Sequence, residues 1–233
     1  MKKVHALALL FAAIFLAADS PTEVEITNEA HHHQVLQNDY VRVFKVEVGP
    51  HDATLMHRHR HDYFYISIGP ADVSNEVEGK SPVELKLQNG QTGFLAANFA
   101  HIARNLSETP FRNLTIELLQ DEKFRTSPPP HWDEERGLNV LHGGTRDILF
   151  VKDGARVSEI ELQPGGMIPS HRHNGPHLVV TITYLDMRSD IEGKGPTPTQ
   201  LKSGDVKWVP GGYTHTLTNV AKQPAKFVTI EFP

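Results

Sequence analysis

Histidines recur at fixed spacings near the C-terminus of this 233-residue chain. His171 and His173 are two residues apart, so on a β-strand both side chains project from the same face. His177 follows an Asn-Gly-Pro turn signal and precedes a β-branched run over residues 178–185, and His215 follows a Pro-Gly-Gly turn. We predict that these four imidazoles converge from three strand segments and bind a metal ion through nitrogen.

The charge of such a site indicates which ion and which chemistry it would suit. Four neutral imidazoles would leave a divalent ion with its full positive charge, and they favour Fe, Cu, Ni or Zn over Mn and Mg. With a coordination position left open, the ion would attract an anionic or enolisable organic substrate. Four histidines closed around it in a tetrahedral arrangement would instead make a structural site. Both alternatives stay open from the residues.

The same pattern occurs earlier in the chain, because the sequence matches itself when shifted by 114 residues. His57, His59 and His101 fall on the first, second and fourth of the histidines above, and Tyr63 falls on the third. A tyrosine can ligate a ferric ion or donate a hydrogen bond beside a metal, so these four residues form a second predicted metal site. The alternative is a vestigial site whose polar residues only line the mouth of a barrel.

These residues resemble the two sequence motifs of the cupin superfamily. Gly165, His171, His173 and His177 have the spacing of the first motif, with histidine at the last position where that motif usually has glutamate. The segment over residues 204–219 fits the second motif at every defined position. The resemblance implies a bicupin, an all-β chain of two tandem cupin barrels of the double-stranded β-helix or jelly-roll type.

The first copy departs from the second motif, since Ala96 and Asn98 stand where that motif has proline and glycine. Periodicity still indicates strands in both copies, including residues 41–48 and 206–209, with Gly and Pro turns between them. Short, regularly spaced strands of this kind are typical of an antiparallel sandwich or barrel.

We therefore predict an N-terminal cupin over residues 21–120 and a C-terminal cupin over 147–233, joined by a Pro-rich linker over 121–146. Residues 1–18 hold two lysines and then an apolar run, which is typical of a signal peptide, although the cleavage site is poorly defined. This predicts a periplasmic or secreted protein. Because the chain has no cysteine, a lipoprotein anchor and disulfides are excluded.

Composition also bears on partners. A formal charge of −5 argues against nucleic acid and anionic membrane surfaces. We expect a small-molecule substrate or ligand, no membrane anchor in the mature form, and a monomer or homodimer. There is no phosphate loop, no GxSxG elbow and no thiol nucleophile in the sequence.

Resemblance to the superfamily allows dioxygenases of the quercetinase and diketone-cleaving type, isomerases, decarboxylases and non-catalytic binders. The first hypothesis is an oxygenase-like or isomerase metalloenzyme at the C-terminal barrel, with Val179 and Thr181 lining its pocket. The alternative is a non-catalytic small-molecule or metal-binding envelope protein with a structural metal. A metal-independent sugar isomerase or storage scaffold is disfavoured because both copies keep their histidines. Fold alone does not decide among these activities.

Other polar residues fit these sites less well. The run over residues 31–33 is three histidines, which we interpret as a surface feature, and His131 and His142 are interpreted as solvated residues in or beside the linker. Glu117 or Glu231 could supply a carboxylate ligand, but we favour a structural or solvated role for both.

Overall fold

The computed structural model describes residues 22–120, 137–152 and 154–233. The regular elements of these residues are β-strands, joined by turns and bends, and one 3-10 turn, η1 (Ile26–Asn28). Within these ranges no helix is both long and apolar enough to cross a membrane. The predicted signal peptide, His131 and the first part of the predicted linker lie outside the described residues.

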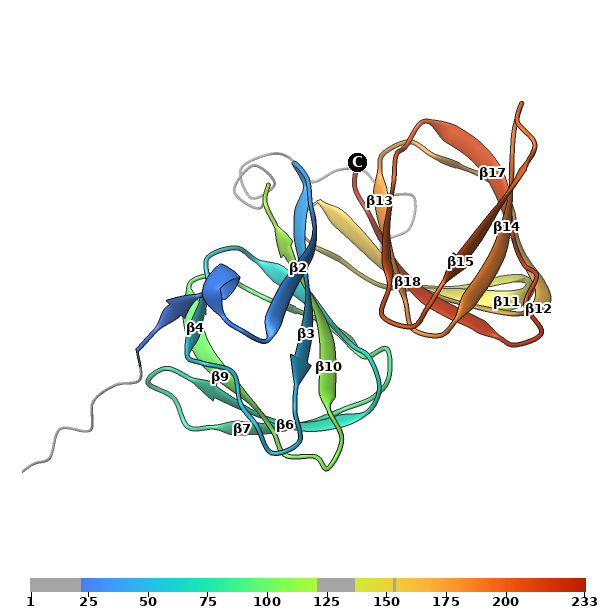
Figure 1. Cartoon of the computed structure of the whole chain (residues 1–233). Helices are drawn as coiled ribbons and strands as arrows, with labels where there is room; N and C mark the ends of the chain where they lie inside the picture. The colour runs from blue at the N-terminus through green and yellow to red at the C-terminus, as the bar shows by residue number, and fades with distance from the viewer. Residues whose placement is uncertain (1–21, 121–136, 153) are drawn as a thin grey trace, which may run out of the picture.

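The first half of the chain folds into two five-stranded sheets (Figure 1). The sheet orders are β1-β4-β9-β6-β7 and β2-β3-β10-β5-β8. A cluster of apolar side chains packs between these sheets, including Phe44 and Val46 from one and Val73 and Leu87 from the other. The strands are β1 (Val24–Glu25), β2 (His32–Gln37), β3 (Val41–Val48), β4 (His57–His59), β5 (Tyr63–Ser67), β6 (Ala71–Val77), β7 (Val83–Leu87), β8 (Thr92–Leu95), β9 (Phe99–Asn105) and β10 (Phe111–Leu118).

The second half forms one sheet that curls into a barrel-like body (Figure 1). Its order is β15-β14-β17-β12-β18-β13-β16, with β11 paired to β12. The long β12 pairs first with β18 and then with β17, and the register shifts between Ile168 and His171, so one strand serves both sides of the barrel. The strands are β11 (Gly137–Lys152), β12 (Ala155–His173), β13 (His177–Thr181), β14 (Leu185–Ile191), β15 (Pro196–Leu201), β16 (Val206–Val209), β17 (Tyr213–Asn219) and β18 (Ala225–Glu231).

Most expected strands are confirmed, and one boundary is wrong. The predicted strands over residues 41–48 and 206–209 have the observed bounds of β3 and β16. Residues 137–146, however, are not linker but the first part of β11, antiparallel to β12. Their polar composition suggested a linker, but ladder pairing to β12 supplies backbone hydrogen-bond partners that composition does not reveal. His142 accordingly pairs with Met167 inside this ladder.

The two halves meet through the outer faces of their sheets. One apolar cluster includes Phe64 and Ile116 from the first half and Leu178 and Ile230 from the second. Because strand side chains alternate in direction, the residues between these apolar ones point to the opposite face, into each barrel. In β10 that inward set is Asn113, Thr115 and Glu117; in β18 it is Phe227, Thr229 and Glu231.

Candidate metal centres

His171, His173 and His215, here called the C-terminal triad, meet inside the second barrel. His171 and His173 lie at the end of β12, and His215 on β17 is the register partner of His171, so the three side chains share one face. Their Nε2 atoms form a nearly equilateral triangle. The separations are 3.0 Å for His171–His173, 3.2 Å for His173–His215 and 3.1 Å for His215–His171.

The hydrogen bonds of the Nδ1 atoms explain why the Nε2 atoms of these rings carry free lone pairs. The Nδ1–H of His171 donates to the carbonyl of Pro169 at 2.8 Å, and Nδ1 of His215 lies 2.7 Å from the hydroxyl of Ser189. Burial lowers the pKa of His171, and it lowers the pKa of His215 to about 3, so both rings are neutral in neutral solution. Neutral rings protonated at Nδ1 turn Nε2 lone pairs toward one another, an arrangement that a cation between them would stabilise.

The size of the triangle fits a metal ion. Two nitrogens each about 2.1 Å from an ion and about 90° apart would be separated by about 3.0 Å, whereas a tetrahedral angle would separate them by about 3.4 Å. The observed separations are nearer the first value. The C-terminal triad therefore suits three adjacent positions of a divalent ion and leaves further positions for other ligands.

His177 lies beside the C-terminal triad. Its ring stacks on that of His173, with centroids 4.1 Å apart and an interplanar angle of 22°. The ligand nitrogens of the triad all lie within 4.8 Å of one another, and His177 is outside that group. Its Nδ1 is buried without a hydrogen-bond partner among the described residues, and burial lowers its pKa to about 3. The structure thus brings three of the four predicted imidazoles together, and ligation by His177 stays a prediction.

Glu231 lies beside the C-terminal triad, on the Nδ1 side of His173. Its Oε2 accepts hydrogen bonds from Arg146 at 2.7 Å and Arg156 at 2.9 Å, and its Oε1 lies 3.6 Å from Nδ1 of His173. Burial would raise the pKa of Glu231, but the nearby ring of His173 and the two arginines outweigh it and hold that pKa well below its ordinary value. The structural role favoured for this glutamate agrees with these contacts.

A cavity of about 410 Å³ adjoins His215 of the C-terminal triad, and a smaller one of about 50 Å³ is lined by all three of its histidines. The walls of the larger cavity are mostly apolar, and the notable polar groups are Ser189, Tyr213, Lys194 and Lys207 beside His177 and His215. Burial raises the pKa of Tyr213 to about 12, which keeps its phenol protonated. The apolar residues are Val179, Leu185, Met187, Ile191, Leu201, Val209, Leu217 and Phe227.

Only one of the two expected lining residues belongs to this cavity. Val179 contributes to the wall, as predicted. The prediction for Thr181 is wrong: it is fully buried and its hydroxyl donates to the carbonyl of Lys202. The physical reason is that β13 ends at Thr181, where its side chain closes a turn through hydrogen bonds to that carbonyl and to the carbonyl of Asp205 at 3.2 Å.

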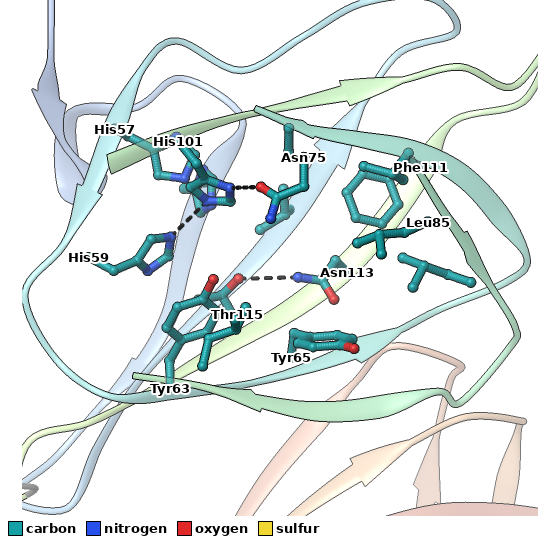
Figure 2. Close-up of a pocket in the computed structure, with 16 residues that line it drawn as sticks. His57, His59, Tyr63, Tyr65, Asn75, Leu85, His101, Phe111, Asn113 and Thr115 are labelled. Atoms are coloured by element: carbon teal, nitrogen blue, oxygen red, sulfur yellow. Dashed lines mark hydrogen bonds between the residues drawn. The ribbon is translucent and has the colours of Figure 1, made fainter. Parts of the chain in front are cut away.

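His57, His59 and His101, the N-terminal triad, form the corresponding group in the first barrel (Figure 2). His57 on β4 is the register partner of His101 on β9, and Nε2 of His59 lies 3.1 Å from Nε2 of His101. His57 Nδ1–H donates to the carbonyl of Leu55 at 2.9 Å, and His101 Nδ1–H donates to Oδ1 of Asn75 at 2.6 Å. Nε2 of His57 is buried without a partner among the described residues, as expected for an atom that could ligate a metal ion.

Tyr63 has the same relation to His59 that His177 has to His173. The rings of Tyr63 and His59 stack with centroids 4.1 Å apart at 16°. Burial raises the pKa of Tyr63 far above its ordinary value, so its phenol is protonated. The structure places Tyr63 beside the N-terminal triad, and its role as a ligand stays a prediction.

The N-terminal triad is more enclosed than its counterpart. His57, His59 and His101 are 0%, 1% and 9% exposed, and the cavity beside them measures about 80 Å³. Tyr65, Asn75, Leu85, Phe111 and Asn113 help to line it (Figure 2). Burial lowers the pKa of His57 to about 4 and lowers those of His59 and His101 well below the ordinary value, so all three rings are neutral.

The sequence did not reveal one imidazole and one carboxylate at this site. His32 was predicted to lie on the surface, but it is 8% exposed and its ring centroid lies 4.6 Å from that of His57. Its Nδ1 donates to the buried carboxylate of Glu29 at 2.6 Å. His33, the next residue, is exposed as predicted. The pairing of β2 with β3, which places His32 opposite Val46, decides which histidine of the run points inward.

Comparisons with known proteins agree with this architecture. Residues 158–231 match the family model of the cupin domain. No curated protein sequence matches the chain significantly. Oxalate decarboxylase structures are similar in fold at 15–16% identity: that of Bacillus subtilis at pH 4.6 has a TM-score of 0.59 over 83% of this chain and 68% of that one.

Two further oxalate decarboxylase structures are similar to the same extent. One, from work on the Mn(II) centres of the Bacillus subtilis enzyme, has a TM-score of 0.60 at 15% identity over 86% of this chain and 75% of that one. Another, on substrate binding mode and reaction specificity, has a TM-score of 0.60 at 15% identity over 83% and 69%. The predicted all-β cupin barrel fold is confirmed, and the family match and the fold together support the cupin superfamily.

Proposed function

We propose that this chain is a metal-binding bicupin whose C-terminal barrel acts on a small anionic or enolisable organic substrate, as an oxygenase-like or isomerase metalloenzyme. One observation carries the proposal: the C-terminal triad offers three convergent bare nitrogens, and its His215 lines a cavity of about 410 Å³. A ligand set of three would leave further coordination positions open on a bound ion.

Equivalent contacts in the two halves support the bicupin organisation with an offset of 114 residues. His57 opposes His101 as His171 opposes His215. Asn105 and Asn219 each turn Nδ2 toward three backbone carbonyls within 3.2 Å. The carbonyls belong to Val48, Gly49 and Thr109 in the first half and to Leu162, Gln163 and Gln223 in the second, each pair 114 residues apart.

Within the C-terminal barrel, the chain's own residues would bind and orient the substrate. When bound, a divalent ion supplies Lewis acidity toward a carboxylate or enolate oxygen. The apolar walls exclude water from the organic part of the substrate, while Lys194 and Lys207 favour an anion at this cavity. Tyr213, protonated at Oη, can donate a hydrogen bond to a substrate oxygen. Ser189 and Glu231 keep His215 and His173 oriented.

The identity of the ion is part of the proposal. Imidazole ligation favours Fe, Cu, Ni or Zn. Mn(II) joins these candidates, because oxalate decarboxylase, which is similar in fold, has Mn(II) centres. At the N-terminal triad, the cavity of about 80 Å³ leaves little room for an organic substrate, so a structural or storage ion is favoured there.

The metal content of protein made without an affinity tag tests the proposal. Mass spectrometry of the wild type is compared with a His171→Ala/His215→Ala variant and with His33→Ala, an exposed control. We expect about one equivalent to be lost in the double variant and none in the control. Substrate-dependent oxygen uptake or isomerisation, lost in the same variant, would support catalysis. A chain that binds no metal after reloading would leave a non-catalytic binding scaffold.

Location and assembly belong to the same proposal. A signal peptide over residues 1–18 would direct the chain to the periplasm or outside the cell, where it acts as a monomer or homodimer. Mass spectrometry of the mature N-terminus and light scattering test these two points. A cytoplasmic chain that keeps residues 1–18 would contradict export.

A further inference from the structure

Glu29 is the centre of a buried cluster beside the N-terminal triad. Its side chain has no exposed surface. Its carboxylate accepts hydrogen bonds from the backbone and ring of His31, both at 2.9 Å, from the ring of His32 at 2.6 Å and from the backbone N–H of Leu55 at 3.2 Å. Burial alone would raise the pKa of Glu29, but the hydrogen bonds from His32 and His31 lower it to about 2. The side chain is therefore a fixed negative charge.

Two routes lead from this carboxylate to His57. Through the backbone, the Glu29 carboxylate accepts a hydrogen bond from the N–H of Leu55, and the carbonyl of Leu55 accepts one from the Nδ1–H of His57. Through the side chains, Glu29 orients His32, whose ring contacts His57 with centroids 4.6 Å apart. The backbone route acts on Nδ1 of His57, the ring nitrogen other than Nε2.

The second half has no equivalent cluster among its described residues. Shifted by 114 residues, the position of Glu29 is Gly143 and that of His32 is Arg146, which pairs with Glu231 instead. The outer nitrogen of His171, the counterpart of His57, bonds to the carbonyl of Pro169, and the surroundings of His171 are less buried. The Glu29 cluster is therefore specific to the first barrel.

We propose that Glu29 and His32 are positioning residues of the N-terminal metal site, which hold His57 in place and make the bound ion slow to leave. The inference rests on the proposed binding of metal by the N-terminal triad. A carboxylate behind a metal-binding imidazole fixes its orientation and strengthens it as a donor, and here the effect passes through one residue. The negative charge of Glu29 also favours a cation at the neighbouring N-terminal triad.

Zinc release to a chromogenic chelator tests this in the full chain. The background is His171→Ala/His215→Ala, so that only the N-terminal triad contributes, and zinc content is measured before each run. In this background Glu29→Gln and His32→Gln are compared with Asp52→Asn. Asp52 is the matched control, because it also reaches the ring of His31, at 3.4 Å, but it is exposed and its carboxylate bonds to neither His32 nor Leu55.

We expect Glu29→Gln to speed zinc release by about 10- to 100-fold, His32→Gln to have a smaller effect in the same direction, and Asp52→Asn to change it less than about twofold. Glu29→Asp, which keeps the charge, should recover part of the loss. Circular dichroism at the assay temperature verifies that each variant is folded. If Glu29→Gln does not fold, the comparison of His32→Gln with Asp52→Asn tests the inference.

Two outcomes overturn the inference and they are distinguishable. Folded Glu29→Gln and His32→Gln proteins that release zinc at the background rate show that the cluster has no effect on the site. A background protein without zinc shows that the N-terminal triad binds no ion. That second result removes the N-terminal site and this inference together, but leaves the C-terminal site, measured separately in the wild type, unaffected.

Discussion

The two barrels carry the same three histidines in the same register, yet their surroundings differ. His215 of the C-terminal triad lines a cavity of about 410 Å³ with two lysines, whereas the N-terminal triad lines one of about 80 Å³ and is backed by the Glu29 cluster. The spacing of the histidines could thus hold a metal ion in either barrel. What a bound ion could do would depend on the surrounding walls, and the larger of the two cavities borders the C-terminal triad at His215.

The glutamates of the last strands show the same divergence. Glu231 is held by two arginines and approaches His173, while Glu117 pairs with Arg42 at 2.6 Å through one oxygen, and its other oxygen is buried without a hydrogen-bond partner among the described residues. Burial raises the pKa of Glu117. At Glu231 the neighbouring cationic groups outweigh burial, and the pKa is lowered. The pKa values of these two equivalent glutamates are therefore shifted in opposite directions, because Glu231 has a second arginine and the ring of His173 nearby.

The largest expected effect separates the two triads. His173→Ala should abolish metal binding in the C-terminal barrel and leave the N-terminal ion, and His59→Ala should do the reverse, since each removes one of three ligands. Metal stoichiometry by mass spectrometry, with catalytic turnover measured in parallel, checks this. Turnover should follow His173 alone; turnover that depends on His59 instead would reverse the assignment of the two barrels.

The glutamate pair should respond oppositely to amide substitution. Glu231→Gln should destabilise the protein by about 3 kcal/mol at neutral pH, because it breaks a buried network with two arginines. Glu117→Gln should be nearly neutral or stabilising, since its carboxylate is disfavoured by burial. Chemical denaturation of both variants measures the difference.

The pH dependence of this pair follows from the signs of the two pKa shifts. The folded pKa of Glu231 is depressed, so its contribution is present above the unfolded pKa of about 4.5 and is lost as the pH falls below it. The folded pKa of Glu117 is raised, so its charged form costs stability above that pKa and the cost disappears as the pH falls. The two variants should therefore converge at acidic pH; a gap that widens there would contradict this account.

A smaller loss of stability, equal in the two halves, is expected from the equivalent asparagines Asn105 and Asn219. Asn105→Ala and Asn219→Ala should each destabilise by about 1–3 kcal/mol, because each leaves buried carbonyls without their donor. Thermal unfolding monitored by circular dichroism compares the two. A much larger loss in one half would show that the equivalent turns do not contribute equally.

The smallest effect concerns the lysines of the larger cavity. Lys194→Ala/Lys207→Ala should weaken binding of an anionic ligand to the C-terminal site by a few-fold at low salt, and less at high salt, since both lysines are exposed and screened. Calorimetry with oxalate as the probe measures this, and Lys222→Ala, an exposed lysine outside the cavity lining, is the control. Equal weakening by the control would remove the lysines from the site.

Much of the fold and of both triads could be predicted from the sequence. Alternation along a strand places His171 and His173 on one face wherever that strand lies, and the repeat then predicts the same for His57 and His59. Residues 137–146 were assigned to a linker, because a strand held mainly by ladder hydrogen bonds has no apolar pattern to reveal it. His32 escaped prediction for a related reason, since three consecutive histidines do not show which one faces inward.

The sequence by itself determined the β architecture and which histidines share a strand face, because these depend on the two-residue period of a strand and on local turn signals. Only the tertiary structure decided that three rather than four imidazoles converge in the C-terminal barrel, that Glu29 stands behind the N-terminal triad and that the two cavities differ in size. These features arise from pairing between distant strands. Side-chain packing at such contacts is set by register and volume, which no local pattern encodes.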